Sequence, residues 1–401
     1  MQALAIKKGM TGSMTEGAGA GQTQTSDAHG QERRWALVAA VRDVGDSRRQ
    51  RVLSYLAKNL NVVTVPVRIS AIRSCLNLIR TISPRKALWR DRSKRNAYYF
   101  RAASLALSDS IGMTPNGAYD VIFLFEALYG PGLGSRTKKP YLIYEDSTSA
   151  LALRTWPDWV PDTARSRAYQ ELESEYYRGA ARIVTSNECA RKSLINDYQI
   201  APGKVVTVGQ GCDFFEANAA NTKRADGLIL FVGYDFERKG GRCLIEAFRQ
   251  VKRAVPFAKL LVVGAKVQVK EDGVEVVERI RDKKKLIETY CSASVFALPA
   301  VYDPMPHAAM EAMSLGVPVV VSTTCGTSEI IEDGVNGLIV PPDDPARLAE
   351  KLVRVLRDPQ LGISLGQAGL QTVRSKLTWE GVANRIIGIV NEVMEEQRSI
   401  R

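Results

Sequence analysis

A group of positive charges and glycines follows an apolar run near the middle of the chain. In the segment GLILFVGYDFERKGG the apolar residues predict a buried strand, and the glycines predict a loop that leads into a helix after Gly240 and Gly241. Backbone N–H groups at such a helix start suit phosphate oxygens, and Arg238 and Lys239 add two positive charges there. The segment therefore indicates a diphosphate site that includes the loop residue Gly233. The alternative is an ordinary tight turn with solvated basic side chains.

A second segment, ALPAVYDPMPHAAMEAM, places two carboxylates around a loop that contains prolines. Asp303 lies in this loop, and the prolines stiffen it and favour a helix that begins near His307. Glu311, one turn into the helix, could accept hydrogen bonds from two vicinal hydroxyls of a ribose. In the alternative interpretation Glu311 only complements the helix dipole and Asp303 only caps the loop.

Three further places could contribute polar groups to the same site. His307 could bond a sugar or a phosphate, although a lone histidine is more often structural. Glu145 and Asp146 follow an apolar strand and could face a sugar or an acceptor hydroxyl, or else cap a helix. Gly45, in the DVGD segment after the first strand, is a similar candidate at the edge of the site.

The elements that must position these residues are short, continuously apolar strands that alternate with longer amphipathic segments. Continuous rather than alternating apolar runs indicate burial on both faces, and hence parallel sheets with helices on each side. Because the alternation occurs twice, it predicts two doubly wound Rossmann-like α/β lobes. The strands are expected at Ala36–Val41, Val62–Val67, Asp120–Phe125, Tyr141–Tyr144, Ala181–Thr185, Val205–Val208, Leu228–Val232, Leu260–Val263, Val274–Val277, Val295–Leu298, Val317–Val321 and Leu338–Val340.

The chain is expected to divide into five parts. A disordered tail at 1–31 precedes an N-terminal, acceptor-binding lobe at 32–213, and a polar linker at 214–226 leads to a C-terminal, donor-binding lobe at 227–376. The segment 377–401 has a helical period and is expected to cross back to the first lobe. Ligands of open α/β sheets bind at the carboxyl ends of the strands, so the site is expected in a central cleft between the facing lobes.

Composition places the chain among globular proteins. The 401 residues are 45% apolar and 24% charged, and no apolar run approaches the ~18 residues that a membrane span requires. The N-terminal residues contain no apolar stretch of the kind that a secretory leader has. Six cysteines form no CxxC pair and only two histidines are present, so we expect no metal site and reduced thiols in the cytoplasm.

Most of the net charge of +12 lies in the first half of the chain, because positions 32 to 213 contain 28 basic and 17 acidic residues. Apolar residues recur there at helical spacing among arginines, at Ile69, Ile72, Leu76 and Ile79. This pattern favours docking on an anionic membrane surface through residues 68–101. The alternative is a helix packed in the core with a solvated basic face. No helix-turn-helix, RRM or zinc-finger motif is present, so nucleic acid is not an expected partner.

Taken together and in this order, the two charged segments resemble the retaining glycosyltransferases of family 4, which have the GT-B fold. The matching motifs are the basic residue followed by glycine and the IEAF helix, the acid and glutamate separated by seven residues, the EAM helix, GVPVV, GTSEIIEDGVNGLIV and LTWEGVANRI. The resemblance covers residues 227–387 and is weak in the first half. Asp303 stands where the family usually has glutamate, and Tyr234 where arginine is common.

The resemblance implies roles for individual residues. Lys239 and Arg238 would hold the donor diphosphate, and Glu311 would bind the ribose hydroxyls. The donor sugar would contact Asp303 and the residues Met305, Pro306, His307 and Ala308, and backbone contacts near Arg281 would recognise the base.

The implied reaction is metal-independent, retaining transfer of a hexose or deoxyhexose from a nucleoside-diphosphate sugar. The acceptor would be a glycan or a lipid-linked molecule in polysaccharide or glycolipid biosynthesis, with no further cofactor. A cytoplasmic location is expected, with peripheral attachment to the inner face of the membrane as an option. A GT-B-fold nucleotide-sugar epimerase or hydrolase and a basic nucleic-acid-binding protein are the alternatives.

Overall fold

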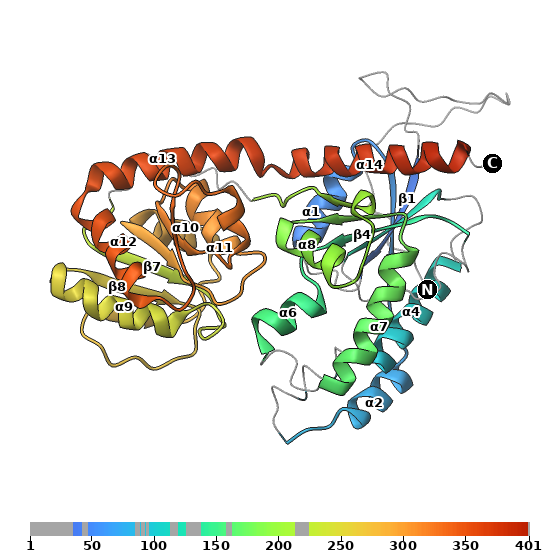
Figure 1. The fold of residues 1–401 in the computed structure, drawn as a ribbon, viewed down its shortest axis with the longest axis horizontal. Helices are drawn as coiled ribbons and strands as arrows, with labels where there is room; N and C mark the ends of the chain where they lie inside the picture. Colours follow the sequence, from blue (N-terminus) through green and yellow to red (C-terminus); the bar gives the residue numbers. More distant parts are fainter. Residues whose placement is uncertain are drawn as a thin grey trace, which may run out of the picture.

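The computed structural model describes residues 35–41, 47–84, 89, 93, 96–112, 119–125, 138–157, 163–212 and 224–399. The tail expected at 1–31, Gly45 and most of the linker expected at 214–226 lie outside these ranges. Figure 1 shows two α/β lobes, with the earlier part of the chain in one lobe and the later part in the other.

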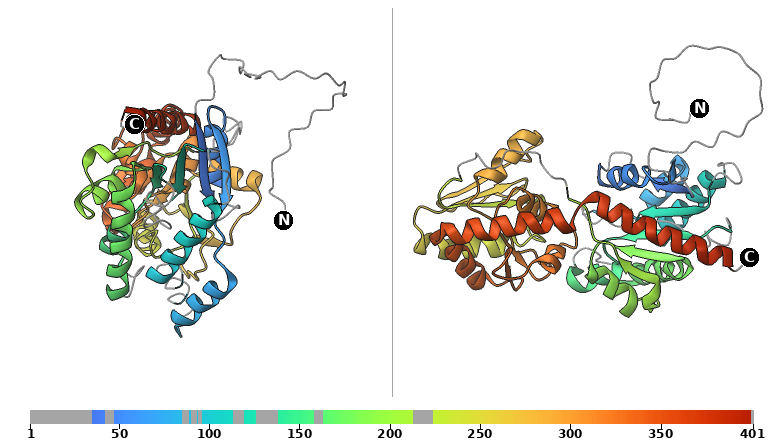
Figure 2. Two further views of the ribbon diagram at one scale, coloured as in Figure 1. Left: turned by 90° about the vertical axis from the view of Figure 1, so that its right-hand side faces the viewer. Right: turned by 90° about the horizontal axis from the view of Figure 1, so that it is seen from above.

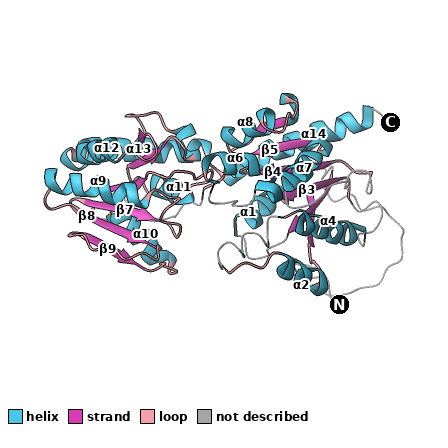
Figure 3. Cartoon of the chain, turned by 60° about the horizontal axis from the view of Figure 1, so that its bottom comes forward, coloured by secondary structure: helices cyan, strands magenta, loops and turns pink. Residues whose placement is uncertain are grey.

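The N-terminal lobe contains a six-stranded parallel sheet of order β2-β1-β3-β4-β5-β6. Its strands β3, β4 and β5 are labelled in Figure 3. Its strands are β1 (Ala36–Val41), β2 (Asn61–Pro66), β3 (Val121–Phe125), β4 (Tyr141–Glu145), β5 (Arg182–Thr185) and β6 (Val205–Thr207). Its helices are α1 (Ser47–Leu56), α2 (Ala71–Arg80), α4 (Ala97–Gly112), α6 (Ser149–Thr155), α7 (Thr163–Gly179) and α8 (Glu188–Asn196), with a short 3-10 helix at Pro202–Lys204.

Both faces of this sheet are covered, which explains why its strands are apolar throughout. In β3, Val121 and Phe123 belong to one hydrophobic cluster, with side chains of α1. The alternate residues of the strand, Ile122 and Leu124, belong to a different cluster with side chains of α4 and α7. Because successive side chains of a strand point to opposite faces, both sets are buried.

The C-terminal lobe contains a second six-stranded parallel sheet of order β12-β11-β10-β7-β8-β9. Its strands are β7 (Leu228–Val232), β8 (Lys259–Val263), β9 (Val274–Val277), β10 (Val295–Leu298), β11 (Val319–Ser322) and β12 (Leu338–Val340). Its helices are α9 (Gly241–Ala254), α10 (Lys283–Ser292), α11 (His307–Ser314), α12 (Pro345–Arg357) and α13 (Pro359–Lys376), and a 3-10 helix covers Gly326–Ile330.

The segment after α13 forms α14 (Trp379–Ser399), which packs on the N-terminal lobe. Figures 1 and 2 show α13 and α14 following one another across the two lobes. Ile386 and Val390 of α14 join the cluster that contains Leu37 of β1. Further along α14, Asn391 Oδ1 accepts a hydrogen bond from the indole N–H of Trp35 at 3.0 Å. The last helix therefore contributes to the core of the first lobe.

The predicted fold class, two doubly wound α/β lobes, is confirmed, and the strands lie within two residues of the expected ranges at each end. The largest difference is β11, which was expected from Val317 and begins at Val319. Val317 N–H donates to Ala312 O at 3.0 Å, so it belongs to the end of α11, and Pro318 has no N–H to donate. None of the helices in the described ranges is long and apolar enough to cross a bilayer.

Candidate active site

The loop between β7 and α9 holds Arg238 and Lys239 against the end of β10. Gly240 has a φ of +75°, and a Cβ atom there would lie 1.9 Å from Pro299 O, so only glycine fits this approach. At Gly233 a Cβ atom would lie 2.3 Å from Lys239 Cδ. The lysine side chain therefore passes directly over Gly233, and the glycines that the sequence contains at these two positions set its path.

Arg238, Lys239 and Asp303 form one buried charged cluster. Lys239 Nζ donates to Asp303 Oδ2 at 2.8 Å, and Arg238 Nη1 lies 3.7 Å from Asp303 Oδ1. Arg238 also donates to Tyr302 O at 2.7 Å and to Asp235 Oδ2 at 3.1 Å. Asp303 is 5% exposed. The structure thus joins three of the predicted residues, from two loops 64 positions apart in the chain.

The pKa of Arg238 is raised above its ordinary value. Its burial alone would lower this pKa, but the negative charges of Asp303 and Asp235 outweigh the loss of hydration. Arg238 therefore keeps its positive charge at a buried position, where a charge needs partners of opposite sign.

The loop that carries Asp303 is fixed by the loop after β11. Gly326 N–H donates to Asp303 O at 2.9 Å. A Cβ atom on Gly326 would lie 2.2 Å from Pro304 O, so glycine is again required by close packing of two backbones. After Asp303 the chain turns into α11: Met305 O accepts from His307 N–H at 2.9 Å, Pro306 is the N-cap residue, and Ala308 is buried.

His307 and Glu311 lie four residues apart on α11 and therefore on the same face, which is less buried than the face that carries Ala309 and Met310. Tyr290 Oη of α10 donates to Glu311 Oε2 at 2.8 Å. Burial and the charge of Glu311 raise the pKa of Tyr290, which keeps this hydroxyl protonated and able to donate. The Gln210 amide nitrogen lies 2.9 Å from either ring nitrogen of His307.

The end of β4 has two different environments. Glu145 is buried and accepts a hydrogen bond from Tyr177 Oη at 3.1 Å, so its carboxylate is held inside the N-terminal lobe. Asp146 follows the strand and accepts at its backbone oxygen from Asn187 at 2.8 Å. Thr148 caps α6 by accepting from Leu151 N–H at 3.1 Å. The helix cap, which was the alternative role for Glu145 and Asp146, is therefore supplied by a residue that follows them closely in the chain.

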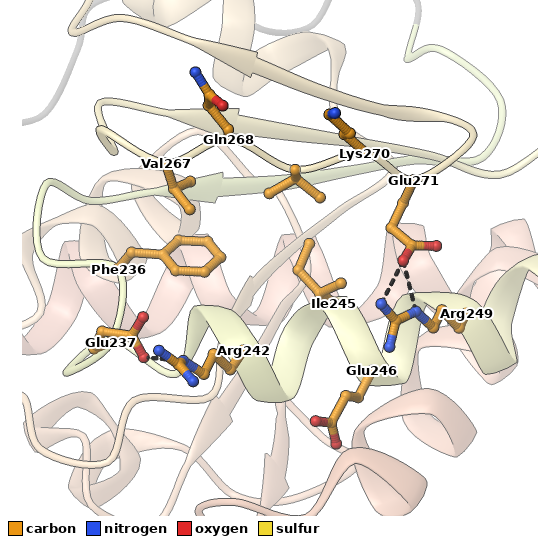
Figure 4. A pocket seen from close by; sticks show the side chains of 11 residues that line it. Phe236, Glu237, Arg242, Ile245, Glu246, Arg249, Val267, Gln268, Lys270 and Glu271 are labelled. Carbon is orange, nitrogen blue, oxygen red and sulfur yellow. Dashed lines mark hydrogen bonds and ion pairs between the residues drawn. The ribbon is translucent and has the colours of Figure 1, made fainter.

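Two hollows lie elsewhere at the carboxyl edge of the second sheet. One, of about 530 Å³, lies at the end of β9 and the start of α10 and contains Arg281 together with Val277 and Lys285. The other, of about 350 Å³, lies beside α9 (Figure 4). Four of its charged side chains form the pairs Arg242–Glu237 and Arg249–Glu271, and its apolar lining includes Ile245. Arg281, the residue predicted to recognise the base, thus lines the hollow at the end of β9 and not the one beside α9.

Several contacts join the two lobes at the ends of their strands. Ser147 Oγ, after β4, forms a short hydrogen bond with Tyr302 Oη, after β10. Glu329 accepts from the N–H groups of Glu188 and Cys189, at the start of α8, at 2.8 and 3.0 Å. A carboxylate at a helix N-terminus interacts favourably with the helix dipole. The carboxyl edges of the two sheets therefore meet.

The interlobe residues Ser147, Tyr302 and Glu329 were not among the predicted site residues. For Glu329 a signal was present, since it lies in the GTSEIIEDGVNGLIV motif that carried the family resemblance. Ser147 and Tyr302 are a serine and a tyrosine in loops, and their pairing depends on how the lobes are oriented.

The family model described as glycosyl transferases group 1 matches residues 226–358. Among curated proteins, the chain is 26% identical over 254 residues to an uncharacterized glycosyltransferase of Methanocaldococcus jannaschii, which covers 57% of this chain and 65% of the relative. It is 32% identical over 183 residues to the phosphatidyl-myo-inositol mannosyltransferase of Mycobacterium leprae, which covers 43% of this chain and 49% of the relative. The matches thus span between about half and two thirds of these relatives.

Two solved structures have the same fold over most of this chain. The sucrose-phosphate synthase of Thermosynechococcus elongatus superposes with a TM-score of 0.66 at 19% identity, covering 90% of this chain and 100% of that one. Anabaena HepE, solved with UDP-glucose, superposes with a TM-score of 0.64 at 12% identity, also covering 90% and 100%.

The fold and the arrangement of the charged loops define a GT-B protein of two Rossmann-like lobes. Residues 226–358 of its C-terminal lobe match the glycosyl transferases group 1 family model, as the family resemblance of the sequence predicts.

Proposed function

We propose that this protein is a retaining glycosyltransferase that moves a sugar from a nucleoside-diphosphate sugar to a glycan or a lipid-linked acceptor. The observation that carries the proposal is the buried cluster of Arg238, Lys239 and Asp303 at the carboxyl ends of β7 and β10. It lies in the lobe that matches the group 1 family. Ligands of open α/β sheets bind at this edge.

In the proposed reaction the two cations stabilise the departing diphosphate. Lys239 and Arg238 are held in fixed positions by Asp303 and by Tyr302 O, so they need little reorganisation when negative charge develops on the leaving group. The backbone N–H groups at the start of α11 add to the same field. In the proposed reaction, Arg238 and Lys239 balance the negative charge of the leaving diphosphate, and no metal or further cofactor takes part.

The remaining donor contacts follow from α11 and its surroundings. We assign Glu311, oriented by Tyr290, to the ribose hydroxyls, and Arg281 with its hollow to the base. The donor sugar would lie between Asp303 and the face of α11 that carries His307. A carboxylate fixed by a buried hydroxyl presents its oxygens in one orientation, which suits a diol.

The acceptor would approach from the N-terminal lobe, whose strand β4 ends at Asp146 and Ser147 beside the donor loop. Several relatives are named as inositol 3-phosphate glycosyltransferases or as a phosphatidylinositol mannosyltransferase. Their names support a glycolipid-type acceptor and transfer of a hexose for this chain.

The test is release of nucleoside diphosphate from a panel of nucleotide sugars, with candidate acceptors present or absent. Lys239→Ala should lower kcat by about a hundredfold or more, the scale found when one charge-stabilising group is removed. Lys270→Ala, which removes a lysine from the hollow beside α9, is the matched control and should keep full turnover. Full turnover in Lys239→Ala would remove the proposed role.

Product analysis separates the proposal from its rivals. A transferase gives a glycosylated acceptor whose anomeric configuration, measured by NMR, equals that of the donor. Release of free sugar that does not depend on any acceptor would indicate a hydrolase, and conversion of the donor into its epimer would indicate an epimerase.

A further inference from the structure

Helix α2 is amphipathic, but it packs polar side chains against the lobe and exposes apolar ones, whereas a surface helix usually does the opposite. Asn77 is 3% exposed and donates from Nδ2 to Ser93 O at 2.6 Å, while it accepts at Oδ1 from Asn96 at 2.9 Å. Thr81, just after the helix, is also buried and donates to Asn77 O at 2.8 Å. Within the described residues, hydrogen bonds of buried polar side chains therefore hold this face of α2 to the N-terminal lobe.

The opposite face of α2 is apolar and open to solvent. Ile72 is 74% exposed and Ile79 is 68% exposed, with the exposed Leu76 between them. Their spacing of four and three residues places them in one stripe along the helix. Ile82, after the end of the helix, is exposed as well. These exposures exclude the core-packed alternative for Ile72, Leu76 and Ile79, whereas Ile69, before the helix, is half-buried and packs against the core of the lobe. Contiguous exposed apolar side chains mark an interaction surface.

Positive charge borders the stripe. Arg68 and Arg80 are exposed and Arg73 is half-buried. The Arg80 guanidinium lies 5.1 Å from the ring centroid of Tyr98, which holds it beside the helix end. No acidic residue occurs between positions 67 and 84. A partner of this surface must therefore accept apolar side chains and carry negative charge.

The position of α2 leaves this surface accessible. The helix follows the carboxyl end of β2 after a short connection, and Figures 1 and 2 show it at an extremity of the N-terminal lobe, away from the C-terminal lobe. Within the part of the chain that the structure describes, the stripe is not covered.

We propose that α2 docks the protein on an anionic lipid bilayer, with Ile72, Leu76 and Ile79 inserted at the boundary between headgroups and acyl chains. Arg73 and Arg80 would bind the lipid phosphates. An anionic bilayer supplies both an apolar layer and a negatively charged surface, as this helix requires. A second copy of the chain fits less well, because symmetric pairing of the stripe would bring like-charged arginines together.

The test is co-sedimentation of the full-length protein with vesicles of phosphatidylcholine alone, or of equal parts phosphatidylcholine and phosphatidylglycerol. The protein should bind the anionic vesicles, and binding should weaken as salt is added. The double variant Ile72→Ser with Ile79→Ser should lower the partition coefficient on the order of tenfold or more. Arg73→Gln with Arg80→Gln should lower it by roughly tenfold and reduce the salt dependence.

The matched control is Val335→Ser with Ile363→Ser, which removes two exposed apolar side chains from the C-terminal lobe and should bind as the wild type does. Thermal melting verifies that each variant is folded. Equal binding of the isoleucine variant and the wild type would overturn the proposal, as would equal binding to both vesicle types. A wild-type dimer that becomes a monomer in the isoleucine variant, with no vesicle binding by either, would assign the stripe to self-association instead. No nucleotide sugar is needed, so the outcome does not depend on the proposed sugar transfer.

Discussion

At the residue scale, Asp303 organises the candidate site. It is one methylene shorter than the glutamate expected from the family resemblance, yet it reaches Lys239 at 2.8 Å. Because Arg238 and Lys239 are buried beside it, this carboxylate is what allows two cations to remain charged in a poorly hydrated place. The sequence predicted all three residues but not their pairing, since each could equally have faced solvent.

Asp303→Asn should therefore destabilise the protein. The amide keeps the size of the side chain but leaves two buried cations with less negative charge, and loss of one partner of a buried pair costs about 3 kcal/mol. The free energy of unfolding, measured in urea, reports this change. Glu237→Gln breaks the exposed pair with Arg242 and should leave the free energy of unfolding nearly unchanged, because water screens this pair. Equal effects of the two substitutions would contradict the organising role of Asp303.

At the scale of elements, the strands were predicted well because burial on both faces makes their apolar runs continuous. The two helix starts predicted from their loops, at Gly240 and Gly241 and near His307, are those of α9 and α11. The loop from β7 to α9 was predicted from its glycines, but the reason for Gly240 is tertiary. Its neighbour is Pro299 O, which directly follows β10 and lies about 60 residues later in the chain.

Gly240→Ala should displace this loop. A Cβ atom at φ +75° costs about 1–2 kcal/mol, and the contact at 1.9 Å with Pro299 O forces the backbone to move. Because Lys239 precedes this residue, turnover should fall together with stability. The control is Gly388→Ala in α14, where nothing lies within 4 Å of the added methyl group, and which should be neutral or stabilising by up to about 1 kcal/mol. Wild-type turnover and melting temperature in Gly240→Ala would show that the loop tolerates the change.

At the scale of the whole molecule, the contacts between lobes could not be predicted from the sequence. The carboxylate of Glu329 in the C-terminal lobe binds the start of α8 in the N-terminal lobe, and neither segment identifies the other as its partner. Partial loss of hydration, and then the charge of Glu329, raise the pKa of the Cys189 thiol to about 11, although the residue is still accessible to solvent. The reactivity of this cysteine therefore reports on the contact.

Glu329→Gln should lower the pKa of Cys189, because removal of the negative charge favours the thiolate. At pH 8, below the raised pKa, the thiolate fraction and hence the rate of alkylation by iodoacetamide should increase several-fold. The measurement uses a Cys75→Ser background, since Cys75 is also exposed. Glu332→Gln, a nearby exposed acid, is the control and should leave the rate unchanged. An unchanged rate in Glu329→Gln would mean that the two lobes do not make this contact in solution.

The path of α14 also has a consequence for biosynthesis. Leu37, in the first strand of the N-terminal lobe, packs with Ile386 and Val390 of the helix that follows the second lobe. On the ribosome, Ile386 and Val390 emerge only after the whole C-terminal lobe has been translated. The lobe that is made first is therefore completed last, and during synthesis it exposes an apolar face that α14 later covers.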